Sequence, residues 1–289
     1  MAIEHTVRST DGLGLFARDY PGEISAQGHV DLGVPVLCLH GLTRNSRDFE
    51  TVAPRIASLG RRVIAMDVRG RGRSDWDATP ARYQPMTYAQ DAVRVLDQLN
   101  VERAVWLGTS MGGIITMAAA QIAPTRIAAA IFNDIGPVID PKGLARIAGY
   151  VGKVEPYGSW DAAAMAVKIL NGAAYPTADD AFWLTMAQRT FRTRPDGRLE
   201  LDYDPAIATG MNPNTPPPDL TPLFAAFAQI PLLAVRGALS DILSRDGIAA
   251  MQSLKSDTEI AEVPGVGHAP TLEEFSAWLP IVDFLAKAA

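Results

Sequence analysis

The segment Gly108-Thr-Ser-Met-Gly-Gly113 constrains the fold of this chain more than any other feature. It joins a strand-like apolar run at 104–108 to a helical pattern at 111–122. A turn this sharp forces its central residue into a strained backbone conformation, and its neighbours must be small because strand and helix nearly touch. We therefore predict that the hydroxyl of Ser110 is presented at a sheet edge as a nucleophile. The alternative is a glycine-rich turn whose serine merely caps a helix.

Short apolar runs alternate with helical patterns over much of the chain. Strands are predicted at 3–9, 13–20, 34–39, 62–66, 104–108, 128–133, 230–236 and 258–263, and helices at 46–59, 87–99, 111–122 and 272–287. The first two strands are separated by Thr-Asp-Gly, which is typical of an antiparallel hairpin. The remaining alternation predicts an α/β fold built on a mostly parallel sheet.

This alternation stops after Asn133. Residues from about 137 to 219 have helical patterns without intervening strands, with one helix from Ser159 to Asn171 and another starting at Thr177. A stiff proline-rich connector at 211–218 closes the section. Open α/β sheets bind ligands at the carboxyl ends of their strands. We therefore predict an all-helical cap at 137–220, inserted between two parts of one core at 1–136 and 221–289.

A serine hydroxyl is a weak nucleophile near neutral pH, so a base must accept its proton. Of the four histidines, His5 and His29 have no catalytic context, and His40 directly follows a predicted strand. His268 ends the glycine-rich segment Val263-Pro-Gly-Val-Gly-His268, between the last strand and the last helix. Such a loop can place an imidazole over the sheet edge, so we predict His268 as the base. The alternative is an ordinary surface-loop histidine.

The base needs a carboxylate to fix its tautomer and stabilise the imidazolium. Asp241 follows the predicted strand at 230–236, and Ser110, Asp241 and His268 occur in the chain order that accompanies a serine on a strand-to-helix turn. Asp134, directly after the strand at 128–133, is the competitor. We favour Asp241, because its loop is expected to point toward the His268 loop. Either aspartate could instead bond only to loop amides.

Acyl transfer also needs hydrogen-bond donors at the developing oxyanion. The N–H of Met111 is one candidate, because it follows the serine at the helix start. The second is expected from His40-Gly41-Leu42-Thr43, and we predict the N–H of Leu42, with His40 orienting this loop. An ordinary strand-to-helix turn is the alternative.

The cap sequence carries large apolar side chains that could line a substrate pocket. We predict Trp160, Trp183 and Met186 as substrate contacts, although residues at helical spacing more often serve packing. Together with Phe182 and Phe191 they suggest an apolar or aromatic substrate group. Arg192 and Arg194 could bind a substrate carboxylate, but a solvated cap edge explains them equally well.

Composition excludes several classes of protein. The formal net charge is −6, and the densest basic stretch, at 69–73, is followed at once by Asp75 and Asp77, so a nucleic-acid partner is not expected. The single cysteine, Cys38, allows no intrachain disulfide. No signal peptide or membrane-spanning run is recognised. These features predict a soluble, cytoplasmic protein with a small-molecule substrate and no membrane partner, and they leave its oligomeric state open.

These motifs together resemble the α/β-hydrolase superfamily. The resemblance rests on His40-Gly41, Asp67-Val-Arg-Gly-Arg-Gly-Arg-Ser-Asp75, the Ser110 turn, the Asp241 loop and the His268 loop, which follow the family's order. It implies an eight-stranded, mostly parallel sheet and no cofactor or metal. Ser110 argues against the similar dehalogenase and epoxide hydrolase branches, which carry an aspartate nucleophile. The single Gly41 departs from the His-Gly-Gly-Gly pattern of one lipase and esterase group.

The leading hypothesis for function is a carboxylesterase that cleaves small to medium apolar or aromatic esters through an acyl-enzyme. Relatives with similar motifs also suggest hydrolysis of a C–C bond in dienoate ring-cleavage products, or cofactor-free perhydrolysis as a side activity. A non-catalytic ligand-binding protein on the same fold is the alternative from a different class. A complete Ser, His and Asp set argues against it.

Overall fold

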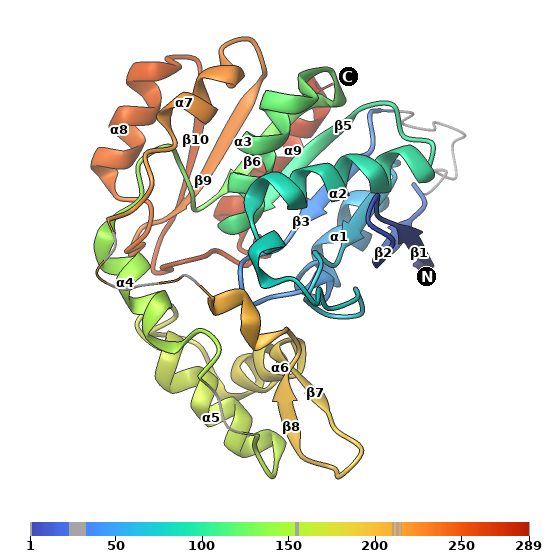
Figure 1. Cartoon of the computed structure of the whole chain (residues 1–289). Helices are drawn as coiled ribbons and strands as arrows, with labels where there is room; N and C mark the ends of the chain where they lie inside the picture. Colours follow the sequence, from blue (N-terminus) through green and yellow to red (C-terminus); the bar gives the residue numbers. More distant parts are fainter. Residues whose placement is uncertain are drawn as a thin grey trace.

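The chain folds around one eight-stranded sheet (Figure 1). In this computed structural model, residues 2–22, 33–153, 156–209, 211, 214 and 216–288 are described, so His29 and part of the proline-rich connector lie outside the description. In spatial order the strands are β1 (Ile3–Arg8), β2 (Gly14–Tyr20), β4 (Val63–Met66), β3 (Val36–Leu39), β5 (Ala104–Thr109), β6 (Ile127–Asn133), β9 (Leu232–Gly237) and β10 (Glu259–Val263). Only β1 with β2 and β2 with β4 pair antiparallel within this sheet. The expectation of an eight-stranded, mostly parallel sheet is confirmed.

Both faces of the central strands are buried, because successive side chains enter two different cores. On β3, Val36 and Cys38 pack in one core with α1 (Val52–Ala57) and α9 (Phe275–Lys287). Leu37 and Leu39 enter the other core with α2 (Pro85–Gln98) and α3 (Met111–Ile122). This period of two explains why the strands are continuously apolar in sequence.

Several helix boundaries differ from the sequence predictions. The helix expected at 46–59 is a short 3₁₀ turn at Ser46–Phe49 followed by α1, because Pro54 is compatible only with the first turn of a helix. Helix α6 (Asp180–Thr190) begins three residues after Thr177, since the side chain of Asp179 caps it by accepting from Phe182 N. Three helices were not predicted individually from the sequence, namely α4 (Pro141–Tyr150), the single turn α7 (Thr221–Phe224) and α8 (Arg245–Leu254).

The segment at 137–220, called the insert below, is not all-helical as predicted. Besides α4, α5 (Trp160–Asn171) and α6, it contains an antiparallel hairpin of β7 (Phe191–Thr193) and β8 (Leu199–Leu201). The hairpin forms because Pro195-Asp196-Gly197 supplies a turn, with Gly197 at a φ of +82° that favours glycine. Figure 1 shows α5, α6 and the hairpin together at one end of the molecule, beyond the sheet. The boundaries at 136 and 220 stay predictions.

Polar contacts fix the insert on the core. Asp202, after β8, accepts hydrogen bonds from Arg47 at 2.6 Å and from Asn45 at 3.0 Å. Asp204 accepts from the hydroxyl of Tyr83 at 2.6 Å. Because these partners lie on loops of the core beside the sheet edge, the insert covers the carboxyl ends of the strands.

The stretch from Asp67 to Asp75 braces the core through Arg69. Its side chain is 1% exposed and bonds three carboxylates, those of Asp11, Asp77 and Asp91, at 2.6–2.9 Å. A buried guanidinium is tolerated when its donors are matched by carboxylates in this way. Among the described residues, no helix combines the length and the hydropathy that crossing a membrane requires.

Candidate active site

Ser110 stands between the last residue of β5 and the first residue of α3, with a φ of +51°. The positions two residues before and two residues after Ser110 must be glycine, because the backbone segments there approach one another too closely to leave room for a Cβ atom. A Cβ on Gly108 would lie 2.4 Å from backbone atoms of Gly112 and Gly113, and one on Gly112 would lie 2.1 Å from the carbonyl oxygen of Leu39. The backbone N–H of Ser110 donates to the carbonyl of Asn133, at the end of the neighbouring strand β6, at 2.9 Å. The turn predicted from the sequence is therefore present.

His268 lies in the loop between β10 and α9, and its ring faces Ser110. Its Nε2 is 2.9 Å from Ser110 Oγ, and its side chain is 10% exposed. The loop is held from the insert side as well, because Gly267 N donates to the carbonyl of Ala174 at 2.6 Å. Of the three histidines that the structure describes, His268 alone bonds to Ser110.

Asp134, and not Asp241, is the carboxylate at the other ring nitrogen of His268. Its Oδ2 is 2.7 Å from Nδ1, and the residue has no exposed surface. Asp134 directly follows β6 at a φ of +57°, a conformation that aspartate tolerates better than most residues. The carboxylate of Asp134 can only accept a hydrogen bond, so Nδ1 of His268 carries the proton of the neutral ring. Nε2 is then free to accept the proton of Ser110 Oγ.

The preference for Asp241 is corrected by this geometry. Its two carboxylate oxygens accept from Arg146 of α4 at 2.6 and 2.9 Å. Burial alone would raise the pKa of Asp241, but the hydrogen bonds and charge of Arg146 outweigh it and hold that pKa below its usual value. The carboxylate is thus bonded to the insert, while its neighbour Ser240 turns inward to Asp134.

The predicted oxyanion donors lie on both sides of Ser110. Met111 is the first residue of α3, where backbone N–H groups have no partner within the helix. On the other side, a Cβ on Gly41 would lie 3.9 Å from that of Ser110, so the Gly41-Leu42 turn borders the nucleophile position. Leu42 lines the cavity described below. The donor roles of Met111 and Leu42 stay predictions.

His40 has the geometry of a residue that orients the loop. It has no exposed surface, and its Nε2 accepts from Val68 N at 3.0 Å. Its Nδ1 bonds to the carbonyl oxygen of Gly41 at 2.8 Å. Because the N–H of Leu42 belongs to the same planar peptide unit as that carbonyl, His40 sets the direction of this donor. Burial lowers the pKa of His40 to about 4, so the ring is neutral at pH 7.

A cavity of about 770 Å³ opens between the sheet edge and the insert, with Ser110 and His268 in its wall. Of the three predicted substrate contacts, Met186 lines this cavity, whereas Trp160 and Trp183 do not belong to its lining. Trp183 is 2% exposed and packs edge-on against Tyr175 and Phe182. Trp183 therefore serves the packing of the insert, and Trp160 is a partly buried side chain packed against the hydrophobic core, so neither predicted tryptophan contact is found in the cavity wall.

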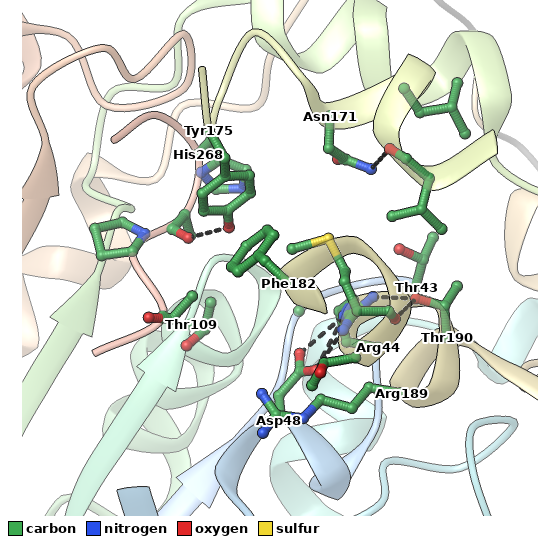
Figure 2. Close-up of a pocket in the computed structure, with 18 of the residues that line it drawn as sticks. Thr43, Arg44, Asp48, Thr109, Asn171, Tyr175, Phe182, Arg189, Thr190 and His268 are labelled. Carbon is green, nitrogen blue, oxygen red and sulfur yellow. Dashed lines mark hydrogen bonds and ion pairs between the residues drawn. The ribbon is translucent and has the colours of Figure 1, made fainter. Parts of the chain in front are cut away.

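Other residues of the cavity wall were not found from the sequence. Figure 2 shows Tyr175 beside His268 on one side of the cavity and Arg44, Asp48 and Arg189 on the other. Asp48 holds the guanidinium of Arg44 with both carboxylate oxygens. Tyr175 donates to the carbonyl of Ala269 at 2.5 Å. No motif marks these residues, because each enters the wall through tertiary packing.

Arg192 and Arg194, the predicted carboxylate binders, lie outside this lining and face the acidic Glu200 of β8. Within the described part of the chain, no three histidine, cysteine, aspartate or glutamate side chains gather as the ligands of a metal ion would. The hydrogen-bonded groups at the cavity are a serine hydroxyl, an imidazole and, behind it, a buried carboxylate.

Comparison with known proteins identifies the family. The profile of the alpha/beta hydrolase fold family matches residues 34–275, so the chain belongs to this family of hydrolases. It is 36% identical over 245 residues to the 3-hydroxybutyrate-oligomer hydrolase of Cupriavidus necator, covering 82% of this chain and 83% of that protein. It is 27% identical over 237 residues to the 2-(acetamidomethylene)succinate hydrolase of Mesorhizobium japonicum, covering 82% of each. The crystal structure of an alpha/beta hydrolase from Novosphingobium aromaticivorans superposes with a TM-score of 0.90, at 44% identity, over 99% of this chain and 98% of that one.

Proposed function

We propose that this protein is a carboxylic-ester hydrolase that works through an acyl-enzyme on Ser110. The observation that carries the proposal is the continuous hydrogen-bonded series from Ser110 Oγ through His268 to Asp134, with Ser110 and His268 in the wall of the cavity. A series of this kind can move a proton from the hydroxyl to the imidazole and stabilise the resulting positive charge with the buried carboxylate.

In the proposed reaction, Ser110 Oγ attacks the ester carbonyl carbon while His268 Nε2 takes the hydroxyl proton. The carbonyl oxygen becomes an oxyanion, which the N–H groups of Met111 and Leu42 stabilise. The C–O bond to the alcohol then breaks, and His268 returns the proton to the leaving oxygen. Water, deprotonated by His268, attacks the acyl-enzyme by the same steps and releases the acid and free Ser110.

Short esters of hydroxy acids are the first substrates to test. A cavity of about 770 Å³ lies within the range of roughly 300–1,000 Å³ that is common for small-molecule sites. The relative named 3-hydroxybutyrate-oligomer hydrolase matches most of this chain and supports an oligoester of that kind. The aromatic and aliphatic side chains of the wall, among them Phe182 and Met186, suit the methyl and methylene groups of such a substrate.

The test is a panel of p-nitrophenyl esters, 3-hydroxybutyrate dimers and trimers, and dienoate ring-cleavage products, assayed with the native protein and Ser110→Ala. We expect hydrolysis of esters and oligoesters, and a loss of kcat of roughly 10⁴-fold or more in the variant. Ser253→Ala, at an exposed position, is the matched control and should keep full activity. Cleavage of dienoates alone would favour C–C hydrolysis, and ligand binding without turnover would favour a binding protein.

A further inference from the structure

Ser240 occupies the loop after β9 that the sequence suggested as the source of the catalytic acid. Its Oγ accepts two backbone hydrogen bonds, from Ile242 N at 3.1 Å and from Leu243 N at 3.0 Å. A serine hydroxyl has two acceptor positions and a single proton. Because both acceptor positions are used by the loop, the remaining interaction of this hydroxyl must be a donated one.

That proton has one partner, Oδ2 of Asp134, at 2.5 Å. The same oxygen faces Nδ1 of His268 at 2.7 Å, and Oδ1 accepts from Gly237 N at 2.9 Å. The carboxylate of Asp134 is therefore held by three donors from two parts of the chain. Two of them, Gly237 and Ser240, come from β9 and the loop that follows it.

We propose that Ser240 is a positioning residue, which fixes the Asp134 carboxylate in line with His268 and takes up part of its negative charge. The proposal rests on the ester hydrolysis proposed above. Without the hydroxyl, the carboxylate loses one donor that restrains its rotation. Its charge is then shared with fewer donors and acts more strongly on the imidazolium, so the protonated ring persists to higher pH.

The other titratable groups around this pair keep their side chains in every Ser240 variant. Tyr175, from the segment between α5 and α6, interacts electrostatically with Asp134, and also with Arg44, Glu274 and Asp48. Asp241 interacts with His268 across the loop and is neutralised by Arg146. A difference in pH dependence between Ser240→Ala and Ser240→Thr therefore reports on the hydroxyl at this position, because the threonine variant keeps it.

The test compares Ser240→Ala with Ser240→Thr, which keeps the hydroxyl, and with Ser240→Cys, whose thiol is a weaker donor. The measurements are kcat and KM for a p-nitrophenyl ester from pH 5 to 9, with thermal unfolding to check folding. We expect Ser240→Ala to lower kcat roughly 10-fold, the equivalent of about 1.4 kcal/mol. We expect KM to change little and the acid limb of the kcat/KM profile to move to higher pH. The threonine variant should stay near the native profile, and the cysteine variant should fall between them.

An unchanged acid limb in Ser240→Ala would overturn the proposal, even if kcat falls, because a merely structural role in the loop lowers activity without moving the limb. If the alanine variant does not fold, the cysteine and threonine variants carry the same comparison. The failure of the proposed function is recognised separately. In that case a fluorophosphonate probe leaves Ser110 of the native protein unmodified, whatever the Ser240 variants do.

Discussion

Nδ1 of His268 lies 2.7 Å from Oδ2 of Asp134, although 134 residues separate the two in the chain. Asp134 follows β6 and His268 follows β10, so the sheet brings them together by aligning the carboxyl ends of its parallel strands. The same edge carries Ser110 at the end of β5 and Asp241 beyond β9. Four candidate groups thus meet at one place, and their hydrogen bonds distinguish them.

Asp134→Asn should lower kcat by roughly 10⁴-fold, because an amide no longer stabilises the imidazolium and favours the wrong tautomer of His268. Asp241→Asn is the matched variant, since it removes a carboxylate from the neighbouring loop without touching Nδ1. It should change kcat less than about 3-fold, while weakening the contact with Arg146. Steady-state measurement of kcat for one ester in both variants shows which aspartate is the catalytic acid. A collapse of kcat in the Asp241 variant alone would contradict the assignment.

Met186→Ala and Trp183→Ala should separate substrate binding from packing on the same helix. Met186 lines the cavity, so its loss should raise KM for longer esters roughly 5-fold with little change in stability. Trp183 is buried against Tyr175 and Phe182, so its truncation should cost about 3–5 kcal/mol of the free energy of unfolding. Urea unfolding and substrate-length series measure both. Equal losses of stability in the two variants would contradict the assignment of Met186 to substrate binding and of Trp183 to packing.

His40 should make the protein less stable as the pH falls from about 6.5 to 4. Its folded-state pKa of about 4 lies below the ordinary value of 6.5, so the unfolded state binds one more proton within this window. The contribution of His40 is complete above the unfolded pKa and decreases as the pH falls to the folded one, by up to about 3 kcal/mol. Urea unfolding at several pH values, compared with His40→Asn, measures it. Parallel curves for the two proteins would exclude this role.

Arg69→Ala should destabilise the core by about 3–5 kcal/mol, because it leaves the buried carboxylate of Asp91 without its cation and leaves Asp77 with only the longer contact to Arg82 at 3.5 Å. Arg69→Lys should recover only part of this, since an ammonium cannot reproduce the planar fork that binds Asp91. Lys287→Ala removes an exposed ion pair with Glu259 and serves as the control, with an expected loss below about 1 kcal/mol. A loss in Arg69→Ala no larger than in this control would contradict the bracing role.

Local patterns in the sequence were sufficient for the core of the fold. The strands and the Ser110 turn were predictable because their determinants are neighbours in the chain, namely apolar runs and the glycines that let β5 and α3 touch. The hairpin of β7 and β8 had a local signal as well, the turn Pro195-Asp196-Gly197 between two short strands. The hairpin was missed because strands of three residues are too short to show a clear alternation of apolar and polar side chains.

The choice between Asp134 and Asp241 could not be made from the sequence. Both follow strands that end at the same sheet edge, and the decision depends on contacts from distant parts of the chain, with Ser240 bonding one and Arg146 bonding the other. The residues of the cavity wall could not be predicted from the sequence for the same reason. Trp183 and Met186 are three residues apart on α6, and helical spacing alone does not say which of them meets the cavity.

The most direct test of the account is to locate the adduct of a fluorophosphonate probe. The native protein is treated with the probe, digested and analysed by peptide mass spectrometry, with Asp134→Asn and Ser253→Ala treated in parallel. We predict a single adduct on Ser110 in the native protein and in Ser253→Ala, formed much more slowly in Asp134→Asn. An adduct on another residue, or ester hydrolysis by a protein whose Ser110 stays unmodified, would contradict it.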